Sequence, residues 1–174
     1  MSPRRAKLRA DRREPLGPQG FSVLELLIVI GIIMTISALA IPSLLHSKMA
    51  ANEAAAVSSL RTIATVEVSY ETTYAIGFAP SLTSLGIPPA STPVGPSHAD
   101  MIDPLLASGI RNGYSFVYNG VDLNGDGTVD VYAVNANPVS PGQTGERYFY
   151  LDQTNVIRQA LDGPAGPSST PIPR

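Results

Sequence analysis

Cysteine is absent from all 174 residues, and only two histidines occur, His46 and His98. The lack of cysteine excludes a disulfide scaffold, a zinc site built from thiolates and a cysteine nucleophile. The chain also lacks a Gly-x-Ser-x-Gly nucleophile turn, a glycine-rich phosphate loop and a His-Glu-x-x-His zinc motif. The sequence therefore gives no support to an enzyme, and we expect a non-catalytic protein.

Charged residues are also scarce, at 15% of the chain, and they are unevenly distributed. Residues 1–20 hold six basic and two acidic side chains, whereas residues 21–174 hold six basic and twelve acidic ones. A basic end, an apolar stretch and an acidic body are typical of a membrane protein whose basic end stays in the cytoplasm. The six basic residues of residues 1–20 are not accompanied by aromatic residues, which is weak evidence for nucleic-acid binding, so we expect no nucleic-acid partner.

A long apolar run occupies residues 21–41, within the stretch GPQGFSVLELLIVIGIIMTISALAIP. A helix of about 20 residues spans about 30 Å, the thickness of the hydrocarbon core of a bilayer. The alternative is a cleaved secretory signal, with Ala38-Leu39-Ala40 as its cleavage site. The run exceeds the apolar region of such a signal, which is about 7–15 residues, so we predict a transmembrane helix in contact with lipid.

One carboxylate, Glu25, lies near the start of this run, which holds no Lys, Arg or His. A charge inside a membrane helix costs about 2.5–3.5 kcal/mol at the bilayer centre and less near its surface, and it usually has a partner. A cut after Gly20 would create such a partner, because the new α-amine of Phe21 would lie one helical turn from Glu25. A neighbouring copy of the chain could supply the same amine.

The string QGFSVLELLIVIGII resembles the leader and N-terminal helix of type IV pilins and type II secretion pseudopilins, and the resemblance extends over about residues 19–75. It implies that a membrane peptidase removes the basic leader, residues 1–20, by cutting between Gly20 and Phe21, and then methylates Phe21. It further implies that Glu25 pairs with the N-terminal amine of an adjacent subunit, and that the helix loosens at Pro42 in the filament.

The same resemblance implies a structural subunit, made as a single-pass prepilin in the bacterial inner membrane with its N-terminus in the cytoplasm. The expected partners are other copies of the chain, the prepilin peptidase, the inner-membrane assembly or secretion machinery and membrane lipid. The expected product is a type IV pilus-like filament. Two alternatives stay open: a type II secretion pseudopilin, and a monomeric membrane-tethered calcium-binding module that needs no cut.

The implied fold class is α+β, a long N-terminal helix with its second half packed on a small antiparallel sheet. We expect one helix over residues 21–76, interrupted locally at Pro42 and stopped by Gly77. Apolar residues at spacings of three and four predict its buried stripe, and we place four charged residues elsewhere on its surface. The stripe is Met49, Ala50, Val57, Leu60, Ile63, Ala64, Val68 and Tyr70 or Tyr74, and the charged residues are Glu53, Arg61, Glu67 and Glu71.

A globular head is expected over residues 77–162, followed by a mobile Pro- and Gly-rich tail over residues 163–174. We predict a surface loop at residues 78–100, a short helix capped by Asp103 and three or four strands within residues 113–160. His46 is interpreted as an interface residue. His98, Asp100 and Asp103 could form a metal site, but helix capping explains the two acids more simply.

The segment DLNGDGTVD is the one place that suggests ligand chemistry. Positions 1, 3, 5 and 9 of a calcium loop are matched by the oxygen-bearing Asp122, Asn124, Asp126 and Asp130, and Gly127 stands at the sixth position, where the chain must turn. The twelfth position should be a bidentate glutamate but is alanine. The alternative is a plain hairpin turn favoured by Asn-Gly and Asp-Gly. No cofactor other than this Ca²⁺ is expected.

Overall fold

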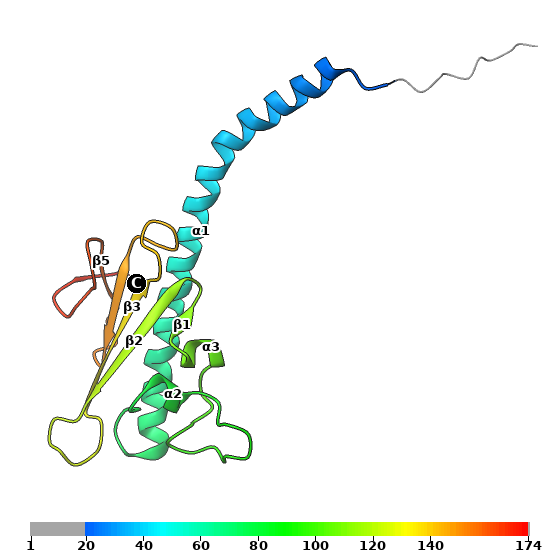
Figure 1. Ribbon diagram of the computed structural model, residues 1–174. Coiled ribbons are helices and arrows are strands. Elements are labelled where there is room, and N and C mark those ends of the chain that lie inside the picture. The colour runs from blue at the N-terminus through cyan, green and yellow to red at the C-terminus, as the bar shows by residue number, and fades with distance from the viewer. Residues whose placement is uncertain (1–19, 174) are drawn as a thin grey trace, which may run out of the picture. The chain divides into compact units, whose positions relative to one another are not determined.

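The structure is a computed structural model that describes residues 20–173, and its fold class is α+β, as the sequence predicts (Figure 1). The helices are α1 (Val23–Tyr74), α2 (Leu82–Leu85) and α3 (Pro104–Ala107). The strands are β1 (Ile110–Arg111), β2 (Tyr114–Val121), β3 (Val131–Pro138), β4 (Tyr148–Asp152), β5 (Arg158–Ala160) and β6 (Thr170–Pro171). They form one antiparallel sheet in the order of the sequence.

The chain divides into two compact units, one ending at Ile41 and the other beginning at Pro42. Helix α1 contributes to both and is 52 residues long. The predicted interruption at Pro42 is wrong, since the α-helix continues through this residue. Proline removes its own N–H and its ring crowds the carbonyl four residues earlier, but the hydrogen bonds on either side of Pro42 maintain the helix.

Helix α1 ends at Tyr74, two residues before the predicted end. Ala75 and Gly77 both adopt left-handed backbone conformations, with φ of 53° and 77°. At Gly77 this conformation coincides with a close approach, because a Cβ there would collide with the carbonyl oxygen of Val129. The sequence predicts that Gly77 stops the helix. The structure adds a second reason for glycine at this position, because any other residue would collide with the backbone just before β3.

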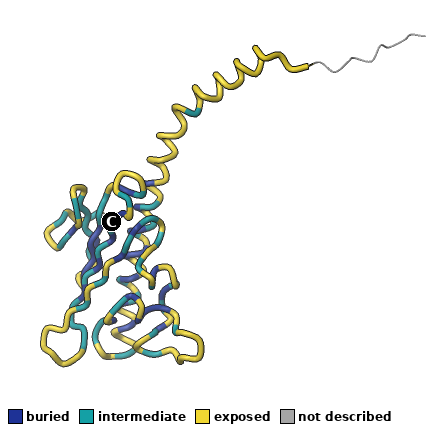
Figure 2. The backbone as a smooth tube through the Cα atoms, in the orientation of Figure 1, coloured by how far each residue is buried: buried dark blue, intermediate teal, exposed yellow. Residues whose placement is uncertain are grey.

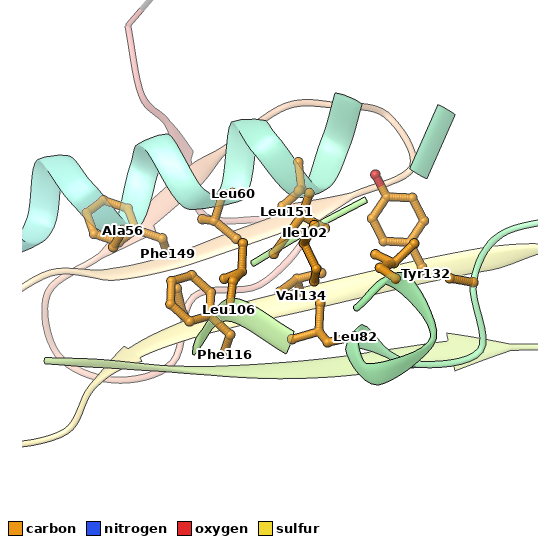
Figure 3. Packing of buried hydrophobic residues seen from close by; sticks show 14 of the residues in the cluster. Ala56, Leu60, Leu82, Ile102, Leu106, Phe116, Tyr132, Val134, Phe149 and Leu151 are labelled. Atoms are coloured by element: carbon orange, nitrogen blue, oxygen red, sulfur yellow. The ribbon is translucent and has the colours of Figure 1, made fainter. Parts of the chain in front are cut away.

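The core of the second unit lies between α1 and the sheet (Figure 3). Alternate residues of β3 point into it, so Tyr132, Val134 and Ala136 are buried and their neighbours are half-buried. The cluster also takes residues from α1, β2, β4 and the two short helices, namely Ala56, Leu60, Ile63, Phe116, Phe149, Leu151, Leu82, Leu85 and Leu106. Burial of each large apolar side chain contributes about 1.5–3 kcal/mol, which holds helix and sheet together.

The predicted surface loop over residues 78–100 is partly wrong. It contains α2, whose N-cap Ser81 accepts a hydrogen bond from the backbone N–H of Ser84. Leu82 and Leu85 of this helix are buried in the core. The Pro-, Ser- and Gly-rich composition conceals this short helix, because its position depends on contacts with distant parts of the chain.

The C-terminal segment also differs from the mobile tail that the sequence predicts. Residues of β6 pair with β5, and Ile172 packs against the core cluster. Ala165 is buried, and its carbonyl oxygen accepts a hydrogen bond from the side chain of Asn135 at 2.7 Å. The sheet therefore has six strands within residues 20–173, where we expected three or four.

Candidate functional site

The predicted cleavage junction lies immediately before α1. Gly20, Phe21 and Ser22 are outside the helix and exposed, and the Phe21 side chain is 70% exposed. The Ser22 hydroxyl accepts a hydrogen bond from the N–H of Leu24, which makes Ser22 an N-cap. The Gly20–Phe21 peptide bond is therefore outside the helical hydrogen bonding. The rest of the predicted leader, residues 1–19, lies outside the described residues.

Glu25 occupies the first turn of α1, where the partial positive charge of the helix N-terminus favours an acid. Its side chain is exposed, and it forms no ion pair with any residue in the range 20–173. The apolar side chains around it are exposed as well, with Val23 at 79% and Leu24 at 67%. A counter-charge for Glu25 must therefore come from outside the described part of one chain.

Helix α1 contains a stretch that is long and apolar enough to cross a membrane, judged by length and composition alone. No residue in that stretch is buried, so it is not a core helix of the folded unit (Figure 2). By contrast, every buried apolar residue of the described chain lies at or beyond Met49. The apolar half of α1 thus has no partner within residues 20–173.

The acidic loop between β2 and β3 is closed by its own side chains. The carboxylate of Asp122 accepts hydrogen bonds from the backbone N–H groups of Asn124, Gly125 and Gly127, at 3.1, 2.6 and 2.8 Å. Asp126 accepts from Thr128, and Asp130 accepts from the N–H of Leu123. These bonds lower the pKa of Asp122 and of Asp126, so both side chains stay ionised.

These hydrogen bonds account for the shape of the loop without a bound cation. The described residues contain no group of three or more His, Cys, Asp or Glu side chains placed to hold a metal. Calcium binding by Asp122, Asn124, Asp126 and Asp130 therefore stays a prediction. The other candidate metal site has a different role. Asp103 caps α3 through the N–H groups of Leu105 and Leu106 and forms an ion pair with Arg111 at 2.7 Å, as the capping interpretation expects.

Two glutamates that we placed on the surface of α1 are buried instead. Glu53 accepts hydrogen bonds from the backbone N–H groups of Glu146 and Arg147, and its other oxygen pairs with the Arg147 Nε at 2.7 Å. These bonds lower the pKa of Glu53 overall, although burial acts in the opposite direction. The partners lie more than 90 positions along the chain, so no local pattern could indicate them.

Glu67 of α1 is fully buried. One carboxyl oxygen accepts a hydrogen bond from the N–H of Ala79 at 3.0 Å, while the other has no hydrogen-bond partner among the described residues. Burial raises the pKa of Glu67 to about 7, against the lowering effect of the hydrogen bond from the Ala79 N–H. Glu67 is therefore an acid that the fold holds largely neutral below neutral pH.

Comparison with known proteins finds no matching family model, no matching curated protein and no matching solved structure. The likeness to pilins and pseudopilins accordingly depends on the residues around the Gly20–Phe21 junction and on the α+β fold class.

Proposed function

We propose that the chain is the precursor of a structural subunit of a type IV pilus-like filament, anchored in the bacterial inner membrane until assembly. The observation that carries the proposal is the single acid, Glu25, in an exposed apolar helix, one turn from a junction that is neither helical nor buried. The leader is removed after Gly20, Phe21 is N-methylated, and the apolar half of α1 forms the filament core with other copies.

The role of Glu25 in this proposal follows from electrostatics. Removal of the leader creates a positively charged α-amine on Phe21 next to an apolar surface. A carboxylate and an amine are each costly to transfer out of water alone, and the cost falls when they pair. Pairing between adjacent copies therefore offsets the cost of burying Glu25 and also sets the axial register of one helix against the next.

The primary test is the mass of the mature protein, produced in cells that contain a prepilin peptidase. We expect loss of residues 1–20 and an added methyl group on Phe21. The variant Gly20→Val should remain uncut in the membrane, because a β-branched side chain replaces glycine at the junction. A wild-type product that retains its first 20 residues would contradict the proposal.

Glu25→Ala separates cleavage from assembly. The variant should be cut normally but should yield far fewer filaments in sheared preparations, and Glu25→Lys should be worse because it places like charges together. Exposed Glu71 lies on the same helix outside the apolar run, so Glu71→Ala is the matched control and should assemble as the wild type does. Wild-type filament yield from Glu25→Ala would remove the assigned role.

The same observation supports a type II secretion pseudopilin, since both classes would use the junction and Glu25 identically. Electron microscopy of fibres sheared from the cell surface separates the two functions: abundant surface fibres support a pilus, and their absence together with a defect in protein export supports a pseudopilus. A membrane-tethered calcium-binding module would retain its leader.

A further inference from the structure

A surface groove of about 540 Å³ lies between α1 and the turn that joins β4 to β5. Its walls come from one face of the helix and from residues 155–157, and a second hollow of about 430 Å³ shares part of this lining and reaches Ile172 and Pro173. Val68, which is 47% exposed, gives it an apolar surface, and the largely buried Ile157 also lines it. Arg61 lines both hollows. We call these two adjoining hollows together the Arg61 groove.

Arg61 is the charged group of the groove. It is exposed and forms no ion pair with any residue that the structure describes. Arg111 and Arg147, by contrast, each form an ion pair within their own chain. The Arg61 groove thus presents an uncompensated positive charge beside apolar side chains, which suits a ligand with an acid next to an apolar group.

The tip of the acidic loop has the complementary properties. Leu123 is 69% exposed, and the ionised, exposed Asp122 and Asp126 stand on either side of it. The loop is held in one shape by the hydrogen bonds of its own carboxylates, so little conformational entropy is lost when it binds. No residue of this loop lines the Arg61 groove of the same chain, so the two surfaces are distinct.

We infer that the Arg61 groove of one copy binds the acidic loop of the next copy, with Leu123 against Val68 and Ile157 and with Asp126 facing Arg61. The inference rests on the proposed filament and names the contact between its heads. Because the two surfaces differ, the contact is heterologous: the first copy keeps its loop free and the next copy keeps its groove free, so further copies can bind at both ends. Such a contact extends into an open chain, as a filament requires.

Cysteine cross-linking tests this contact, because the natural chain has no cysteine to interfere. The double variant Val68→Cys with Leu123→Cys should give a ladder of dimers and higher oligomers on a non-reducing gel after mild oxidation of filaments. A disulfide needs the two Cα atoms within about 7 Å, so a ladder reports direct proximity. Each single variant should give no ladder, since only one half of the contact carries a thiol.

Charge exchange gives an independent measurement. Arg61→Glu should lower filament yield at least about tenfold, since like charges in a contact cost several kcal/mol. Adding Asp126→Arg to it should restore part of the yield, because the new charge pair is attractive although the hydrogen bonds from Thr128 to Asp126 are lost. Lys48→Glu makes the same charge change at an exposed position of α1 outside the groove and should assemble normally.

The results of these experiments distinguish failure of the proposed head contact from failure of the proposed filament function. If wild-type protein is cut and forms filaments, but the double-cysteine filaments give no ladder, or Arg61→Glu assembles as well as Lys48→Glu, the contact is wrong and the proposed function stands. If the wild-type chain keeps its leader, the proposed function and this contact both fail.

Discussion

At the scale of single residues, Glu67 is the most unusual group in the head. Its carboxyl is fully buried, with one oxygen bound to the Ala79 N–H and the other unpaired among described residues. A neutral carboxylic acid fits this position better than a carboxylate, because no described cation faces it. Tyr118, whose hydroxyl donates to the carbonyl oxygen of Ala79 at 2.6 Å, belongs to the same small polar group.

The raised pKa of Glu67 predicts a pH dependence of folding. The native state binds the proton more tightly than the unfolded chain, so this contribution is fully present below the ordinary pKa of 4.5 and is lost as pH rises to about 7. The difference amounts to about 3 kcal/mol in the free energy of unfolding. Glu67→Gln should therefore be more stable than the wild type at pH 8 and similar to it at pH 4.5.

Denaturant titrations at several pH values measure this difference directly. Glu71→Gln is the control, because Glu71 is exposed one turn further along α1 and should leave the pH profile unchanged. Equal pH profiles for Glu67→Gln and the wild type would show that Glu67 titrates normally in the folded protein.

At the scale of elements, the connection between β3 and β4 is fastened to α1 by polar contacts. Glu53 binds both the backbone and the side chain of Arg147, and the side chain of Asn52 donates to the carbonyl oxygen of Thr144 at 2.8 Å. These bonds fix residues 139–147, which carry few buried apolar side chains. The segment thus depends on the helix for its conformation.

Glu53→Gln should loosen this connection. The amide would place an N–H against the Arg147 guanidinium, so at least one of the observed hydrogen bonds is lost, at a cost of about 1–2 kcal/mol. Hydrogen exchange should become faster in residues 139–147 and stay unchanged in β2. Glu146→Gln, at an exposed position next to Arg147, should leave exchange as it is in the wild type.

The loop between β2 and β3 offers a second test at this scale. The calcium-loop pattern predicts that millimolar Ca²⁺ raises the melting temperature of the protein and that Asp126→Ala abolishes the rise. Mg²⁺ at the same concentration is the control for simple charge screening. An unchanged melting temperature would leave the loop as the hydrogen-bonded turn that its backbone contacts describe.

Local patterns predicted some elements and missed others for identifiable reasons. The alternation in residues 113–120 predicted β2, and Asp103 before a proline predicted the start of α3. Helix α2 was missed because burial of its leucines depends on distant segments. Likewise, the motif around Gly20 and Glu25 is local and readable, whereas the Arg61 groove joins residues 61–69 to residues 155–157 and exists only in the fold.

At the scale of the whole molecule, the two units have opposite relations to water. Residues 20–41 expose their large apolar side chains, while the unit that begins at Pro42 buries many of its own in one cluster. A truncated chain that begins at Pro42 should therefore be soluble without detergent, whereas the longer chain should need detergent. A circular dichroism spectrum with helix and strand signals would confirm that the truncated chain folds.

Helix α1 continues through Pro42, but this residue can donate no backbone hydrogen bond. Along a helix under tension, the hydrogen bonds between successive turns carry the load, and the turn that ends at Pro42 has one fewer than the others. A pulled filament of such subunits should therefore lengthen first at this turn. In the proposed filament, a proline at this position would make the fibre extensible before any subunit detaches.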